Sequence, residues 1–524
     1  MRNIQDCFCK MTYWLLIIFT SLLGTDGWSD NRQRKFKDDF LFGAATSAYQ
    51  VEGAWNIDGK SESIWDRYFH EHPEVVVDGR NGDVGSDSYH QYKRDVELLR
   101  ELGVDFYRFS MSWNRILPTG FPNKINEKGI QYYDNLINEL LKYNIEPVVT
   151  LFHFDLPQTL QDLGGWANPL CIEWFEEYAR VVFDKYADKV KYWITVNQPN
   201  DICIESYESD RWPPAAESKG IGPYLCIKNV MLAHANVYRL YVNEYKNKYK
   251  GSVGISLAVN WLEPLNNKTE NVEAVELYRE FTLGLFINPI WSKEGDFPQV
   301  VKDIVAKRSK EQGFTKSRLP ILSKQEIKLL KGSSDFLGIN HYTTSLVSPS
   351  SDEFPSPSIA DDVRVQLSKR SEWKIAKSPW LASAPYGIYK ACIHINLKYD
   401  YPPVFITEHG WSTDVGLQDE DRAYNLREYM KAILLAIEDG TNLKGYTAWS
   451  LIDNVEWSAG TSERFGLYEV DFDSDDKTRT PRLSAHVYKR LIKTRVVEEN
   501  WKPKSMKMKI SDRKFKEPEP KAEL

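Results

Sequence analysis

Eight short apolar runs alternate with longer amphipathic stretches between residue 40 and residue 490, and this alternation limits the possible folds more than any other feature. Several runs are almost continuously apolar, as parallel strands buried on both faces must be. Eight such strands, each followed by a helix, make a (β/α)₈ barrel. The sequence therefore predicts an α/β fold, a TIM barrel with long βα loops. The runs are FLFGAA from Phe40, DFYRFS from Asp105, EPVVTLF from Glu146, YWITV from Tyr192, SVGISLAV from Ser252, DFLGI from Asp335, PVFIT from Pro403 and GYTAWS from Gly445.

The segments between these runs have the periodicity of amphipathic helices. In residues 126–144, apolar side chains recur at intervals of three and four, which places them on one helical face. Residues 168–190 repeat this pattern, and Pro169 follows Asn168 as at the start of a helix. The expected buried residues are Tyr133, Leu136, Ile137, Leu140 and Leu141 in the first helix, and Phe175, Tyr178, Ala179, Val182 and Phe183 in the second.

The length of 524 residues would allow two or three domains, but no internal repeat and no long Gly/Ser linker marks a boundary. One barrel over residues 38–497 is the simpler prediction. Residues 498–524 are rich in Lys, Pro and Glu and lack apolar periodicity, so a disordered tail is expected there. The last four residues, KAEL, differ in one position from the ER-retrieval signal KDEL, so both retention in the ER and plain secretion stay open.

The first residues have the layout of a secretory signal peptide, predicted to cover residues 1–27. Arg2 and Lys10 precede the apolar run 13–23, which is too short to span a bilayer, and small polar residues follow. A buried strand or helix is the alternative. In an oxidising compartment a disulfide between Cys203 and Cys226 could form, although sequence cannot fix the pairing, and the sequon at Asn267 could carry a glycan. An extracellular glycoprotein is the resulting expectation.

Composition points to a small-molecule ligand rather than a nucleic acid. The net charge of the chain is -7, which argues against the concentrated positive surface that phosphate binding needs. Aromatic residues make up 13% of the chain, with 17 Trp and 29 Tyr, so many rings must lie in a large core or around a binding cleft. Sequence says nothing of the oligomeric state.

Polar and aromatic residues stand at or just past the ends of the apolar runs. Alone, each has an ordinary structural explanation, since a single His after a strand is more often structural than catalytic. Together they point to chemistry, because the loops at the C-terminal rim of a barrel converge on one pocket. These residues are Gln50, Arg108, His153, Asn197, Asn340, Tyr342, Glu408 and Trp449.

The chain resembles glycoside hydrolase family 1, which contains β-glucosidases and myrosinases, and it looks most like the animal or insect branch. The resemblance covers residues 40–488. The motifs that carry it are FLFGAATSAYQVEGAW, YRFSMSWNRILPTG, DLPQTLQDLGGW, DFLGINHYTT, FITEHG and GYTAWSLIDNVEWSAGTSERFGLYEVDF.

The resemblance implies a retaining β-glycosidase, in which two carboxyl groups stand about 5 Å apart across the scissile bond. Glu408 matches the nucleophile, Arg108 would keep it ionised by lowering its pKa, and Tyr342 matches its hydrogen-bond donor. Trp380 resembles the aromatic residue that packs on the aglycone. Neither a metal nor a required cofactor is implied. The residues that match the sugar-binding set are Gln50, His153, Asn197, Trp449, Glu456 and Trp457.

One departure from the family pattern concerns catalysis directly. Where the family has Asn-Glu-Pro, this chain has Asn197-Gln198-Pro199. An amide has no proton to give, so Gln198 cannot act as general acid or base, a loss that typically costs about 10² to 10⁴ in rate. Plant myrosinases resemble this chain in carrying Gln here. They cleave thioglucosides with stable leaving groups and use ascorbate, so an ascorbate-like external base could assist here too.

Three hypotheses follow from Gln198. The first is a myrosinase-like glycosidase restricted to β-glucosides or thioglucosides with good leaving groups. The second is a broad β-glucosidase in which another acid or water compensates; Glu205 and Glu208 are near in sequence, but nothing places either at the bond. The third is a catalytically impaired pseudoglycosidase that binds β-glycosides or a partner. Retention of Glu408 with Arg108 speaks against the third, since a pure binder needs no activated nucleophile.

Overall fold

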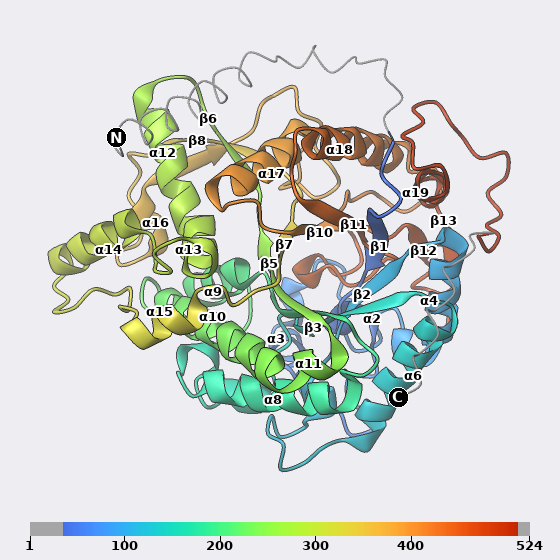
Figure 1. Ribbon diagram of the computed structural model, residues 1–524, viewed down its shortest axis with the longest axis horizontal. Coiled ribbons are helices and arrows are strands. Elements are labelled where there is room, and N and C mark those ends of the chain that lie inside the picture. Colours follow the sequence, from blue (N-terminus) through green and yellow to red (C-terminus); the bar gives the residue numbers. More distant parts are fainter. Residues whose placement is uncertain (1–34, 512–524) are drawn as a thin grey trace. The chain divides into compact units, whose positions relative to one another are not determined.

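The computed structural model describes residues 35–511 and contains a closed barrel of eight parallel strands (Figure 1). Around the barrel the order is β1-β11-β10-β7-β5-β4-β3-β2. Each barrel strand therefore lies beside the barrel strand that follows it in the chain, and the short strands β6, β8 and β9 form a separate sheet. All eight predicted runs form these strands, and the predicted (β/α)₈ fold is confirmed. The strands are β1 (Leu41–Ala45), β2 (Phe106–Ser110), β3 (Glu146–Phe152), β4 (Tyr192–Asn197), β5 (Ser252–Ala258), β7 (Phe336–Asn340), β10 (Val404–His409) and β11 (Leu443–Trp449).

Helices surround the barrel on the outside (Figure 1). The longer ones are α4 (Ser88–Leu102), α6 (Glu127–Lys142), α8 (Cys171–Tyr186), α10 (Gly222–Leu240), α12 (Thr269–Arg279), α14 (Gln299–Glu311), α17 (Tyr386–Lys398), α18 (Glu420–Glu438) and α19 (Leu483–Thr494). The shorter ones are α2 (Ala48–Val51), α3 (Ile64–Glu71), α5 (Trp113–Ile116), α7 (Gln158–Gln161), α9 (Pro199–Glu208), α11 (Lys246–Tyr249), α13 (Leu285–Trp291), α15 (Lys324–Leu330) and α16 (Ile359–Val363). Small sheets in the loops are made by β6 (Trp261–Pro264), β8 (Thr344–Pro349) and β9 (Val365–Ser368), and by β12 (Tyr468–Val470) and β13 (Arg479–Pro481).

The two helices predicted in detail form with small differences. In α6 the expected apolar face is buried except for Leu141, which is only half-buried because it lies at the edge of the stripe. Helix α8 begins at Cys171, later than the Asn168–Pro169 start predicted from sequence. Its predicted apolar face is fully buried, as the three- and four-residue spacing requires.

An apolar layer fills much of the N-terminal half of the barrel. Phe106, Val148, Ile194 and Phe336, from four different strands, pack together there. A cavity of about 220 Å³ remains among these side chains and faces the N-terminal ends of the strands. Since chemistry in this fold is carried by the opposite rim, the apolar layer serves to support the strands that reach it.

The loop after β4 is fixed to the helical shell by a disulfide. Cys203 of α9 and Cys226 of α10 are bonded, so the pairing left open by sequence is present in the structure. Residues 498–511 form no helix or strand, yet they hydrogen-bond to the shell, with Arg427 donating to the Trp501 carbonyl (2.7 Å). The predicted signal peptide and the tail beyond residue 511, including KAEL, lie outside the described residues.

Among residues 35–511, no helix has both the length and the apolar character that crossing a membrane requires. The same part of the chain holds no group of three or more His, Cys, Asp or Glu side chains arranged to bind a metal ion.

Candidate active site

A cleft of about 500 Å³ opens at the C-terminal ends of the barrel strands. The residues that sequence analysis assigned to the site line this cleft, apart from Arg108, Asn197 and Asn340, which lie directly beneath it. Segments far apart in the chain are brought together here because parallel strands end at the same rim. The predicted residues in the lining are Gln50, His153, Gln198, Tyr342, Trp380, Glu408, Trp449, Glu456 and Trp457.

Glu408 lies near the end of β10 and is held from two sides. Arg108 Nη1 donates to its Oε1 at 2.7 Å, and Tyr342 Oη donates to its Oε2 at 2.8 Å. Burial raises the pKa of Glu408 above its ordinary value, while the charge of Arg108 and the bond from Tyr342 oppose that rise. The expectation that Arg108 sets the pKa was therefore incomplete, because burial has the larger effect. A desolvated carboxylate with few hydrogen bonds is a stronger nucleophile than one in water.

The side chains beneath the cleft orient this carboxylate. Arg108 Nη2 donates to Asn197 Oδ1 at 2.7 Å, and the same oxygen accepts from Asn340 Nδ2 at 2.9 Å. Asn197 Nδ2 in turn donates to His153 Nε2 at 3.2 Å. Asn197 is fully buried, so in this arrangement it positions Arg108 and His153 rather than facing the cleft.

His153 is a neutral hydrogen-bonding group at the cleft wall. Burial and the nearby charge of Arg108 hold the pKa of His153 well below its ordinary range. Its ring stacks on Trp449 at a centroid distance of 5.7 Å, with 15° between the planes. A neutral imidazole next to an indole face suits a sugar, which presents hydroxyls at its edge and C–H groups on its face.

A second carboxyl group, Glu456, lines the cleft together with Glu408. Gln50 Nε2 donates to its Oε2 at 3.3 Å and Trp449 Nε1 donates to its Oε1 at 3.2 Å. Burial raises the pKa of Glu456 to about 8. Each of its oxygens keeps capacity for a further bond, so the group can accept from neighbouring sugar hydroxyls.

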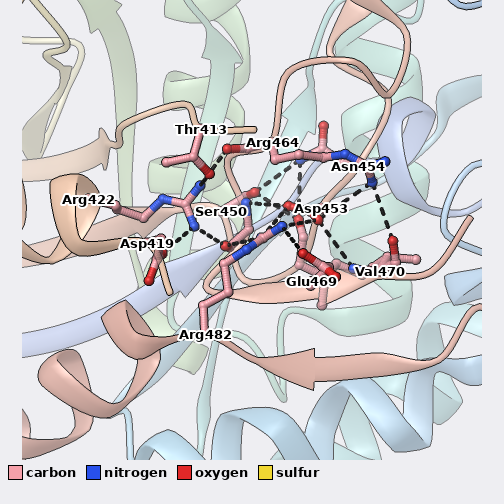
Figure 2. A network of polar contacts seen from close by, with 12 residues as sticks. Thr413, Asp419, Arg422, Ser450, Asp453, Asn454, Arg464, Glu469, Val470 and Arg482 are labelled. Carbon is pink, nitrogen blue, oxygen red and sulfur yellow. Dashed lines mark hydrogen bonds and ion pairs between the residues drawn. The ribbon is translucent and has the colours of Figure 1, made fainter. Parts of the chain in front are cut away.

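A buried polar network holds the loop that carries Glu456. Arg482 binds Asp453 in a bidentate pair, Nη1 to Oδ1 at 2.7 Å and Nη2 to Oδ2 at 2.8 Å, with both side chains fully buried (Figure 2). The Asp453 carboxylate also accepts from the backbone N–H groups of Gly466 and Val470. The next residue, Asn454, accepts from Gln50 Nε2 at 3.0 Å, which ties the network to the cleft.

Replacing Asp453 with Ala should lower the free energy of unfolding by about 3–5 kcal/mol, because Arg482 would lose its buried bidentate partner and keep only the partly exposed Glu469. Urea denaturation measures this effect. Asp473→Ala is the control, since Asp473 pairs with Arg80 at an exposed surface, and such pairs contribute little. Equal denaturation midpoints for the two variants would contradict the structural role given to Asp453.

Gln198 follows β4 as the residue before helix α9, in a left-handed conformation with φ 42° and ψ 57°. Its Oε1 accepts from Asn197 Nδ2 at 3.1 Å, and its Nε2 donates to Asp201 Oδ2 at 2.9 Å. A non-glycine residue in this region carries backbone strain, which persists where the surroundings fix a functional side chain. The side chain faces the cleft together with Glu408, but it offers an amide.

Several lining residues were missed by sequence analysis. Asp201 lies three positions after Gln198, on the same side of the first turn of α9, a spacing that could have indicated it. Of the two acids that sequence placed nearby, Glu205 lines the cleft, whereas Glu208 accepts from the backbone of Gly220 and Ile359 and does not. Asn260 directly follows the apolar run of β5, so its place at the rim could also have indicated it. Trp212, Glu463 and Phe465 lie in loops outside the barrel strands, where strand periodicity gives no signal.

The outer part of the cleft is aromatic and acidic. Trp380, which is 47% exposed, packs edge-on against Tyr342 at 5.6 Å. Asp201, Glu205 and Glu463 add carboxyl groups, and no Lys or Arg is among the described residues that line the cleft. An aromatic, neutral aglycone fits such walls better than an anionic one.

Comparisons with known proteins identify the family of this chain. The family model for glycosyl hydrolase family 1 matches residues 32–497. Myrosinase 1 from Brevicoryne brassicae is 44% identical over 463 residues, which cover 88% of this chain and 99% of the relative. The solved structure of an aphid myrosinase matches with a TM-score of 0.85 at 44% identity, covering 88% of this chain and 99% of that chain.

A second solved structure is a glutamate-to-glutamine mutant of a rice β-glucosidase in a covalent complex with glucose. It matches with a TM-score of 0.81 at 36% identity, covering 87% of this chain and 98% of that chain. Glycosidases of this family need no cofactor. Since the family model spans most of the chain and the relatives match over nearly their full length, this chain belongs to glycosyl hydrolase family 1.

Proposed function

We propose that this protein is a retaining β-glycosidase that uses Glu408 as nucleophile and acts on β-glucosides or thioglucosides whose leaving groups depart without receiving a proton. The observation that carries the proposal is the pairing, in one cleft, of a Glu408 carboxylate held by Arg108 and Tyr342 with an amide at Gln198. The similar proteins include both a myrosinase, from an aphid, and a β-glucosidase, from rice.

In the first step, a Glu408 oxygen attacks the anomeric carbon. The bond from that carbon to the leaving oxygen or sulfur breaks, and its electron pair departs with the aglycone as an anion. In the second step, water attacks the same carbon, the ester bond returns its electrons to Glu408, and the water proton goes to a base. Two inversions give net retention of configuration.

Gln198 decides which substrates can complete the first step. With no proton from the amide, the aglycone must be stable as an anion, so aryl oxides and thiolates qualify and alkoxides do not. The covalent glucose complex of the rice mutant supports this reasoning, because that mutant also has Gln in place of a Glu. The acidic walls of the outer cleft favour neutral aromatic aglycones over sulfated ones.

A purely binding role is less well supported. Burying Arg108 and Glu408 as an ion pair costs desolvation energy and adds little affinity for a neutral sugar. A binding protein would gain nothing from an activated carboxylate aimed at the anomeric position. The arrangement beneath the cleft is instead what nucleophilic attack requires.

We also propose that the protein works in the secretory pathway. The Cys203–Cys226 disulfide supports this, since such bonds persist in oxidising compartments. Asn267 lies on an exposed loop after β6, where a glycan could be attached. Retrieval to the ER through KAEL and release from the cell are the two outcomes that immunolocalisation of the full chain would separate.

The leaving-group series tests the proposed function. For aryl β-glucosides of increasing leaving-group pKa, we expect kcat/KM to fall by about tenfold per pKa unit, because an unassisted bond cleavage places nearly full charge on the departing oxygen. The measurement uses nitrophenyl, chlorophenyl and alkyl β-glucosides, with the α-anomers as controls that should not react. Equal rates for the nitrophenyl and alkyl β-glucosides would sink the proposal.

A further inference from the structure

A carboxyl group lies one hydrogen bond beyond Gln198. Asp201 Oδ2 accepts from Gln198 Nε2 at 2.9 Å, and Asp201 lines the cleft alongside Glu408. The mechanism above leaves one role unfilled, because the second step needs a base for the attacking water. The amide of Gln198 cannot serve, so the carboxyl group that is hydrogen-bonded to it becomes the candidate.

Asp201 also lines a second, smaller cavity. This cavity, of about 150 Å³, lies behind α9 and shares both Asp201 and Asn260 with the substrate cleft. Asp201 is half-buried between the two spaces, since its side chain borders both. A carboxyl group in this position can exchange a proton with water even when a sugar fills the cleft.

The charges around Asp201 come from several elements. Glu205, one turn later on α9, and Glu408 on β10 both act on it, and burial together with their negative charge raises the pKa of Asp201 to about 7. On the far side, Tyr278, Arg279 and His394 line the smaller cavity with it. A carboxyl group poised near neutral pH suits proton transfer in both directions.

We propose that Asp201 is the general base of the second step, taking the proton of the attacking water in place of the residue at position 198. This inference rests on the proposed function, since it presupposes a glycosyl ester at Glu408. The Oδ of Asp201 takes a proton from water directly or through one further water. The new C–O bond forms at the anomeric carbon, and the ester electrons return to Glu408.

Asp201 can act as a base in the second step because two conditions change between the steps: the access of water to Asp201 and the charge of Glu408. In the first step the aglycone fills the space in front of Gln198, so Asp201 is reached by no water on that side. After the aglycone leaves, water enters that space. Formation of the ester also removes the negative charge of Glu408, which lowers the pKa of Asp201 and leaves it ionised at neutral pH.

Gln198 then has a positioning role. Its Nε2 donates to Asp201 and its Oε1 accepts from Asn197, so the amide fixes the carboxyl group relative to the side chains beneath the cleft. Asp201→Asn is therefore a clean test. An amide oxygen at residue 201 still accepts from Gln198 Nε2 and has the same shape, but it cannot take a proton.

The experiment follows the hydrolysis of dinitrophenyl β-glucoside by stopped flow for the wild type and Asp201→Asn. Each rate is divided by the burst amplitude of the same enzyme, so that only folded, active sites are counted. We expect an unchanged burst rate and a steady-state rate lower by about 10²-fold. Azide, a nucleophile that needs no base, should restore turnover in the variant and form a β-glucosyl azide. The fall in steady-state rate on the acidic side of pH 7 should also disappear.

Glu208→Gln is the matched control, because Glu208 lies on the same helix but does not line the cleft, and the amide oxygen of Gln can still accept from the backbone of Gly220 and Ile359. We expect its steady-state rate to change by less than about threefold. An Asp201→Asn enzyme with an unchanged steady-state rate, or an equal loss in both variants, overturns the assignment of Asp201 and leaves the proposed function standing. A wild type that forms no covalent glycosyl-enzyme with a 2-fluoro dinitrophenyl glucoside overturns the proposed function itself.

Discussion

Replacing Gln198 with Glu should raise kcat/KM for alkyl β-glucosides by about 10² to 10⁴. The side chain already faces the cleft with Glu408, and Glu has the same length as Gln, so the new carboxyl group would occupy the same position. The negative charges of Glu408 and Asp201 would raise its pKa and keep it protonated for the first step. The departing alkoxide would then receive the proton that the amide cannot supply.

Initial rates on methyl and octyl β-glucosides measure this gain, with dinitrophenyl β-glucoside as the substrate that needs no acid and should gain little. Gln131→Glu is the control, because Gln131 is an exposed residue of α6 and makes the same chemical change far from the cleft. A Gln198→Glu enzyme without any gain on alkyl glucosides would mean that the defect in proton transfer lies elsewhere.

Replacing Glu408 with Gln should lower turnover of every β-glucoside by about 10⁴-fold or more, including substrates with the best leaving groups. The amide keeps the shape and can still contact Arg108 and Tyr342, but it cannot form the glycosyl ester. Burst kinetics with dinitrophenyl β-glucoside measure the loss, and the burst itself should vanish.

Glu463→Gln is the control for this variant, since Glu463 lies in the outer cleft and its carboxylate accepts from Ser378. It should change turnover by less than about tenfold, because it removes a charge without touching the reacting carbon. Substantial dinitrophenyl glucoside hydrolysis by Glu408→Gln would contradict the assignment of the nucleophile.

The barrel and the rim residues were predictable from sequence because their signals are local. A parallel strand buried on both faces is an apolar run, and the residue after it, such as Glu408 in β10, falls on the rim by the geometry of the fold. The resemblance to a known family then suggested a role for each rim residue. The start of α8 was misplaced because helix termini depend on contacts that periodicity does not report.

Other features depend on tertiary structure and could not be predicted. The position of Glu456 depends on the pair between Asp453, in the same loop, and Arg482, 29 positions after Asp453 in the chain, and sequence periodicity does not show this pair. Asn197 is buried by side chains from other strands, which sequence does not place around it. The raised pKa of Glu408 results from competition between desolvation and the neighbouring charge of Arg108. The spacing of Asp201 from Gln198 could have indicated that it faces the cleft, but its role depends on the two cavities that it borders, which sequence does not show.

The central claim is that Glu408 forms a covalent bond to the sugar although position 198 carries an amide. It is tested most directly by incubating the protein with a 2-fluoro glucoside that has a dinitrophenyl leaving group, followed by intact-mass and peptide analysis. The 2-fluoro group slows both steps, and the activated leaving group keeps the first one fast enough to observe. We predict that the mass of one fluoroglucosyl group is added per chain, on the peptide containing Glu408. An unmodified protein after prolonged incubation, or a label on another residue, would contradict the claim.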